Sequence, residues 1–239
     1  MSFLTAEWRK LAMANYIVPP ELLAPYVPIG TELDLWEGKC YVSLVGFMFL
    51  NTKLLGVKIP FHSNFEEVNL RFYVKRFDST GYKRGVVFIK EIVPKPALTW
   101  VANTVYKENY ETLPMKHRWE ISSHQNEITY LWKKNNSWNT FTVITNGVAE
   151  PIPSDSEVEF ITEHYWGYAC KNKSASIEYE VTHPKWEHYP IQEFTIDVDF
   201  NKVYGAPFGF LKELQPTSVF LAEGSPITVE NKRVIKASY

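Results

Sequence analysis

Four polar side chains at alternate positions of an apolar segment are the part of this chain best suited to chemistry. They are Glu67, Asn69, Arg71 and Tyr73. Successive side chains of a β-strand point to opposite faces, so the four share one face of a predicted strand. There Arg71 could hold a carboxylate through two parallel hydrogen bonds, with Glu67 beside it as a proton donor or acceptor. The same pattern is also typical of the solvent side of a half-exposed sheet.

A second segment, residues 86–93, is apolar on both faces except at Lys90 and Glu91. These two neighbours point to opposite faces, so at least one of them points inward if both faces are covered. A buried unpaired charge is strongly destabilising, and we therefore expect Glu91 to pair with Arg71 or Lys75 across an antiparallel hairpin. The two interpretations of Glu91 are an internal ion pair without chemistry and a catalytic carboxyl.

Two further groups of titratable residues are candidates. Lys116, His117 and Arg118 form a cationic cluster, which is either an anion site containing a lysine of lowered pKa or a solvated basic loop. His164 lies in a helix that is predicted to start after Ser156 and to run to about residue 166. A histidine there could titrate near neutral pH, or it could simply pack against the helix.

Composition and motifs narrow the classes of partner. The 239 residues carry a formal net charge of −2 with no basic tract, which argues against nucleic acid and anionic membranes as partners. Cys40 and Cys170 have no metal-binding spacing, and the sequence contains no phosphate loop or dinucleotide fingerprint. We therefore predict neither a metal nor a cofactor. Early charges such as Glu7 and Arg9, with no long apolar run, favour a cytoplasmic protein.

Many short strands separated by turn signals predict one mainly β domain over residues 1–239. A hairpin is expected from segments 32–36 and 40–50, and two short closing strands from segments 219–221 and 227–229. Helices are expected at 21–26, 97–110, 156–166 and 208–214. Closure of the sheet into a barrel would remove its exposed edges.

Several long blocks of the sequence resemble the YqjF-like family, a bacterial family of unknown function (domain of unknown function 2071). The blocks are residues 64–71, 85–94, 113–118, 160–168, 183–184 and 220–225. The likeness extends from about Phe3 to Val229. It implies an acetoacetate decarboxylase-like fold, which is a closed, cone-shaped antiparallel β-barrel with a central cavity and a few short helices.

The resemblance does not imply decarboxylase activity. Acetoacetate decarboxylases carry a Pro-Lys-Lys motif whose first lysine forms an imine with the substrate and whose second lysine lowers the pKa of the first. The similar segment here is Pro114-Met115-Lys116. A thioether cannot form an imine, so only the helper lysine has a counterpart.

These observations lead to two functional hypotheses and a third alternative. In the first, the barrel binds a small, anionic organic molecule through Arg71 and catalyses a lyase or proton-transfer reaction with Glu67, Glu91 or Lys116. In the second it is a carrier or sensor without chemistry, and in the third a protein-interaction module. The remaining predicted ligand-binding residues are Asn69, Tyr73, Lys90, His117 and His164. The sequence leaves open whether the protein is an enzyme, and it is compatible with a homodimer.

Overall fold

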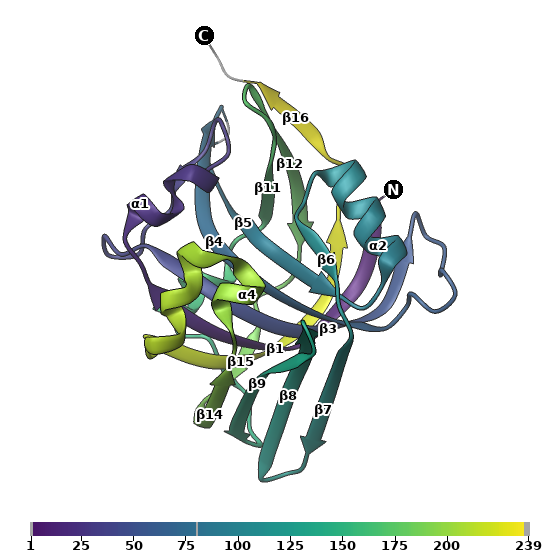
Figure 1. The fold of residues 1–239 in the computed structure, drawn as a ribbon, viewed down its shortest axis with the longest axis vertical. Helices are drawn as coiled ribbons and strands as arrows, with labels where there is room; N and C mark the ends of the chain where they lie inside the picture. Colours follow the sequence, from purple (N-terminus) through teal and green to yellow (C-terminus); the bar gives the residue numbers. More distant parts are fainter. Residues whose placement is uncertain (1, 80, 237–239) are drawn as a thin grey trace.

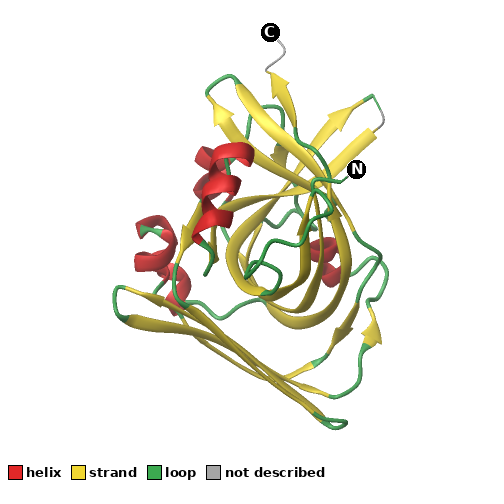
Figure 2. Cartoon of the chain, turned by 90° about the vertical axis from the view of Figure 1, so that its right-hand side faces the viewer, coloured by secondary structure: helices red, strands yellow, loops and turns green. Residues whose placement is uncertain are grey.

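The computed structural model describes residues 2–79 and 81–236, and its main feature is a closed ring of hydrogen-bonded strands. Figure 2 shows the ring nearly end-on. Its strands, in order around the ring, are β1 (Leu4–Ile17), β3 (Tyr41–Leu54), β4 (Phe65–Asp78), β5 (Gly81–Val93), β11 (Trp166–Asn172), β12 (Ala175–Thr182) and β15 (Ser218–Val229). β15 pairs with both β12 and β1, and this double pairing closes the ring. The fold is therefore mainly β, as predicted.

A second, four-stranded antiparallel sheet forms a separate layer against the ring (Figure 1). It contains β7 (Met115–Ile121), β8 (Gln125–Lys134), β9 (Ser137–Asn146) and β14 (Ile191–Asp197). Shorter strands extend the first sheet: β2 (Glu32–Leu33), β6 (Tyr110–Thr112), β10 (Glu150–Pro151), β13 (Glu187–Tyr189) and β16 (Arg233–Lys236).

Both faces of β4 are covered by protein. Leu70 and Phe72 belong to the same fully buried apolar cluster as Tyr130 of β8, so this face of β4 packs toward the four-stranded sheet. The polar side chains at positions 67, 69 and 71 have the opposite parity and line a cavity inside the ring. The alternation that is visible in the sequence therefore separates the core from the cavity, and the polar face does not meet bulk solvent.

A β-bulge in β5 decides which of its charged residues faces the cavity. Arg71 of β4 pairs with Phe88, but Leu70 pairs with Lys90, so Ile89 is an extra residue in β5. The Asn109 side chain donates a hydrogen bond of 2.6 Å to the Ile89 carbonyl. Because the bulge shifts the alternation by one residue, Phe88 and Glu91 both line the cavity.

The helices are short and lie around the ring. They are α1 (Pro20–Leu23), α2 (Pro96–Val101), α3 (Glu157–Thr162) and α4 (Phe200–Tyr204), with 3-10 turns at Ala24–Tyr26 and Ala206–Glu213 and a π-helical turn at Ala102–Tyr106. No helix in the described part of the chain is long and apolar enough to cross a membrane.

Three predictions about local structure are corrected. Ser156 caps α3 as predicted, but the helix ends at Thr162, before His164. The predicted hairpin of 32–36 with 40–50 is reduced to a single antiparallel bridge between Trp36 and Lys39, and β2 pairs with β4 instead. The two predicted closing strands are parts of one long strand, β15.

The closure of the ring predicts an intolerant glycine in β15. Gly224 has a φ of +81°, and a Cβ there would lie 2.0 Å from the carbonyl oxygen of Trp8 in β1. We expect Gly224→Ala to lower the free energy of unfolding by more than about 2 kcal/mol, which lowers the Tm by roughly 4–8 °C. Gly38→Ala is the control, because Gly38 has a φ of +75° but open space around it. Equal Tm losses in the two variants would contradict the steric argument.

Candidate functional site

The ring encloses a cavity of about 330 Å³. Most of its lining is apolar and aromatic, including Trp8, Phe47, Phe49, Phe88, Tyr106 and Trp186. A smaller set of polar side chains enters from β4, β5, β6, β12 and the segments next to them. An apolar hollow with a few convergent polar groups is the usual form of a small-molecule site.

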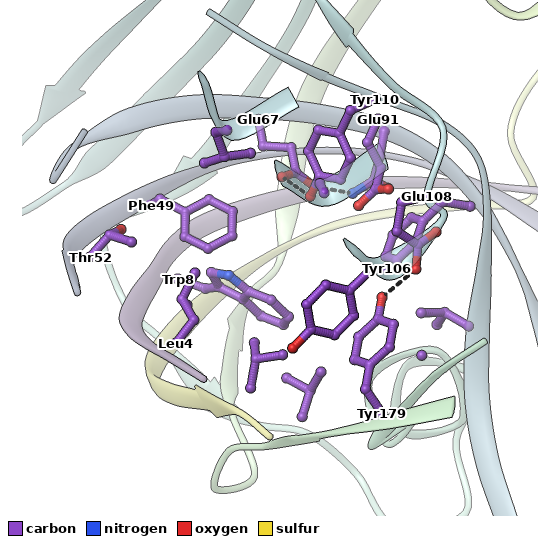
Figure 3. Close-up of a pocket in the computed structure, with 18 of the residues that line it drawn as sticks. Leu4, Trp8, Phe49, Thr52, Glu67, Glu91, Tyr106, Glu108, Tyr110 and Tyr179 are labelled. Carbon is purple, nitrogen blue, oxygen red and sulfur yellow. Dashed lines mark hydrogen bonds between the residues drawn. The ribbon is translucent and has the colours of Figure 1, made fainter. Parts of the chain in front are cut away.

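Three carboxyl groups, Glu67, Glu91 and Glu108, make up what we call the acidic end of the cavity (Figure 3). Glu67 is 2% exposed, and both of its oxygens accept hydrogen bonds. Asn69 Nδ2 lies 3.0 Å from Glu67 Oε1, and the Tyr110 hydroxyl lies 3.1 Å from Glu67 Oε2. Glu91 is also 2% exposed, and its Oε2 atom has no hydrogen-bond partner among the described residues.

Glu108 reaches the acidic end because the chain turns sharply after the π-helical turn. Lys107 has a φ of +62°, and this left-handed residue stops the helix just before Glu108. The Tyr179 hydroxyl donates a hydrogen bond of 2.7 Å to Glu108 Oε1. β6 starts two residues later and pairs with β5, so that Tyr110 lies opposite Glu91. The turn and the strand pairing together assemble the acidic end.

Removal from bulk water raises the pKa of all three carboxyl groups. Burial raises the pKa of Glu67 to about 7, against the opposing hydrogen bonds from Asn69 and Tyr110 and the charge of Arg71. Enclosure in the cavity wall raises the pKa of Glu108 to about 8. Burial, and then the charges of Glu108 and Glu67, raise the pKa of Glu91 well above its ordinary value. At neutral pH the acidic end therefore holds most of its protons.

Arg71 is a buried cation without an ionic partner. It is 7% exposed and lines the cavity. Its Nε atom has no hydrogen-bond partner, and its Nη2 atom makes only a weak contact of 3.9 Å with the Met13 sulfur. The described residues place no carboxylate in an ion pair with it. The guanidinium is therefore free to take a ligand, and the centroid of the Tyr73 ring lies 5.7 Å from its carbon atom.

Two histidines line the cavity in their neutral form. His164 Nε2 lies 3.2 Å from Asp34, whose carboxylate also accepts a hydrogen bond of 2.7 Å from Arg84. Burial lowers the pKa of His164 to about 4, although the hydrogen bond to Asp34 opposes this. Burial also lowers the pKa of His183 to about 4. The Tyr73 ring lies 5.7 Å from the Arg71 guanidinium and 4.6 Å from the His164 ring, and we call Arg71, His164 and His183 the second end of the cavity.

The structure brings together only some of the residues predicted from the sequence. Those that line the cavity are Glu67, Asn69, Arg71, Glu91 and His164. Tyr73 is fully buried, and its hydroxyl is hydrogen-bonded to the Ser43 hydroxyl at 2.7 Å. It is not among the residues that line the cavity. Glu91 pairs with neither Arg71 nor Lys75, because its neighbour in the β4 register is Asn69.

The predicted cationic residues lie outside the cavity. Lys116 and His117 are exposed on β7, in the second sheet, where Lys116 stacks over Trp138 at 5.3 Å and His117 contacts Glu66 at 2.7 Å. Lys90 points away from the cavity because of the bulge, and it pairs with Glu111 at 3.0 Å. None of these three side chains lines the cavity.

Sequence reasoning missed Glu108 and Tyr179 as cavity residues. The predicted helix over 97–110 would have placed Glu108 on a helix surface, and no local signal marks the turn at Lys107. Tyr179 had a signal, because the apolar alternation over 177–181 placed it on a buried face. Among the described residues no three His, Cys, Asp or Glu side chains are arranged to hold a metal ion.

The same fold and sequence pattern occur in other proteins. The sequence profile of the DUF2071 family, described as an uncharacterized conserved protein, matches residues 5–226. The chain is 27% identical over 216 residues to the uncharacterized protein YqjF of Bacillus subtilis (strain 168), which covers 87% of this chain and 83% of YqjF.

Two solved structures show the same fold at low sequence identity. The acetoacetate decarboxylase of Legionella pneumophila superposes with a TM-score of 0.65 at 10% identity, over 97% of this chain and 86% of that one. The enduracididine biosynthesis enzyme MppR, complexed with pyruvate, superposes with a TM-score of 0.66 at 10% identity, over 98% of this chain and 91% of that one. The ring and its attached sheet are thus an acetoacetate decarboxylase-like fold.

The raised pKa of Glu67 predicts a stability loss with rising pH. The folded protein binds more protons than the unfolded one between the ordinary pKa of 4.5 and the folded value of about 7, so stability falls across this window. We expect Glu67→Gln to retain roughly 1–3 kcal/mol of unfolding free energy that the wild type loses there. Urea unfolding at a series of pH values measures this, with exposed Glu120→Gln as the control. Parallel pH profiles of Glu67→Gln and the wild type would refute the assignment.

Proposed function

The chain belongs to the DUF2071 family, and from the ring cavity we propose that it binds a small organic molecule whose carboxylate is anchored by Arg71. The observation that carries this proposal is the unpaired state of Arg71. A cation this deeply buried is costly without a counter-ion, and a carboxylate fits its planar fork of N–H donors. A bound ligand would supply the missing charge.

The rest of the cavity is compatible with such a ligand. Its volume of about 330 Å³ suits a molecule of a few to about a dozen non-hydrogen atoms. The carboxyl groups of the acidic end are largely protonated at neutral pH, so they do not repel an anion at Arg71. MppR, which shares the fold, has been crystallised with pyruvate, and pyruvate is therefore a reasonable first probe.

A second candidate function is proton transfer on the bound molecule, and it is favoured by Glu67. A carboxyl group with a pKa of about 7 is well matched to general acid–base catalysis at neutral pH. Imine chemistry of the acetoacetate decarboxylase kind is not supported, because no lysine occurs among the described residues that line the cavity. The alternative is a carrier or sensor, in which Glu67 contacts the bound molecule without transferring a proton. The open cavity favours proton transfer and the carrier or sensor over a protein-interaction module.

Arg71→Met should abolish ligand-induced stabilisation. At a pyruvate concentration about a hundredfold above Kd, binding adds about 2.7 kcal/mol of stability, which is a rise in Tm of roughly 5–10 °C. The variant keeps the length and packing of the side chain but lacks the charge, so we expect no such rise. Arg118→Met is the control, because Arg118 is exposed on β7. Differential scanning fluorimetry with pyruvate and other small carboxylates gives the readout, and an unchanged rise in Arg71→Met would contradict the proposal.

If Glu67 transfers protons, the protein should exchange the methyl hydrogens of pyruvate with solvent without forming an imine. Proton NMR in D₂O measures this exchange against buffer alone, and we expect Glu67→Gln to slow it by at least about a hundredfold. Borohydride added to the same mixture should leave the intact mass of the protein unchanged. A trapped adduct would overturn the imine-free mechanism, and exchange no faster than in buffer would favour the carrier or sensor.

A further inference from the structure

We infer that the acidic end binds a protonated amine, so that the ligand of the whole cavity is an amino-carboxylate. The inference rests on the proposed function for its carboxylate half, but its amine half stands on separate residues. The carboxylate would lie at Arg71, and the amine among Glu67, Glu91 and Glu108. Arg71 follows Glu67 by four residues along β4, which corresponds to about 13 Å between their Cα atoms.

When the carboxyl groups of the acidic end are ionised, they offer unused acceptors, and the neighbouring side chains have no donors left for them. The hydroxyl protons of Tyr110 and Tyr179 are donated to Glu67 and Glu108. The Asn69 amide also donates to Glu67. The Oε2 atom of Glu91 remains buried and unpartnered, and Figure 3 shows the Glu91 carboxyl turned toward the hollow. An ammonium group brings three donors and no acceptor, which is the complement of this arrangement.

The charges point to the same ligand. None of the three carboxyl groups forms an ion pair with a cation of the described residues, unlike the fully buried Glu178, which pairs with Arg76 at 3.4 Å and with Lys83 at 3.7 Å. The acidic end therefore collects carboxyl groups without a resident counter-ion. A cation in the hollow would favour their ionised forms and would gain charge-assisted hydrogen bonds from them.

Aromatic rings surround the position where the cation would sit. Tyr106 and Tyr179 meet edge to face with ring centroids 5.1 Å apart, and both line the cavity with Trp8 and Phe49. Figure 3 shows these rings around the hollow below the carboxyl groups. Aromatic faces attract cations, and acidic groups combined with such rings are a recurring way to recognise organic ammonium ions. The two features lie in the same half of the cavity.

The test uses probes that carry one group each. Isothermal titration calorimetry with butylammonium should show binding that weakens at least about tenfold in Glu91→Gln and in Glu108→Gln, but not in Arg71→Met. Butyrate should show the reverse dependence. Exposed Glu120→Gln is the matched control for both probes. Two variants of the acidic end are used so that a folding defect in one does not decide the result.

Binding of the amine should also release protons. The titratable groups that face Glu91 are Glu67, Glu108, Tyr110 and Tyr179, and Arg71 is the charged group at the other end. A cation that favours ionised carboxylates should release on the order of one proton per bound butylammonium at neutral pH, whereas butyrate should release none. Titrations in buffers of different ionisation enthalpy measure this number.

The outcomes separate the two claims. γ-Aminobutyrate should bind at least about tenfold more tightly than butyrate, which lacks the amine. β-Alanine should likewise bind at least about tenfold more tightly than propionate. Three results would overturn the amine inference and leave the carboxylate site at Arg71 intact. They are equal binding within both pairs, no binding of butylammonium, and binding of butylammonium without proton release. Butylammonium binding that depends on Glu91, together with butyrate binding that ignores Arg71, overturns the proposed function instead.

Discussion

The structure depends on one constraint, which is that protein covers both faces of β4. One face packs against the apolar side of the second sheet, so the polar side chains of the other face can only point into the ring. Carboxyl, amide and guanidinium groups that are buried without water must be hydrogen-bonded, ionically paired or placed next to a ligand. Glu67 meets this requirement through its hydrogen bonds with Asn69 and Tyr110, whereas Arg71 faces the cavity without an ionic partner among the described residues.

The two ends of the cavity resolve this burial in different ways. At the acidic end the carboxyl groups are largely protonated, because burial raises their pKa values by more than the nearby hydrogen bonds and the charge of Arg71 lower them. At the other end Arg71 keeps its charge, and the nearby histidines are neutral. An interior with buried ionisable side chains is less stable than an apolar one. Such a loss of stability is characteristic of binding and catalytic sites. Both proposals use the groups that the fold leaves uncompensated.

The comparison with acetoacetate decarboxylase-like structures illustrates how one fold accepts different interiors. The ring and the attached sheet superpose over nearly the whole chain at about one-tenth sequence identity, so the architecture is retained while the side chains differ. Met115 and Lys116, which resemble the lysine motif of the decarboxylases, lie on β7 away from the cavity. Chemistry within this fold therefore has to be inferred from the residues that face the hollow.

The sequence by itself determined the period of β4, and hence that Glu67, Asn69 and Arg71 share a face, because side-chain alternation is a local property of a strand. It also determined the capped start of α3 and the β-rich class. Only the tertiary structure decided that the polar face meets a cavity, since this depends on ring closure and on the second sheet. The bulge at Ile89, which turns Glu91 inward and Lys90 outward, and the turn that inserts Glu108 arise from pairing between distant segments, and no local pattern specifies such pairing.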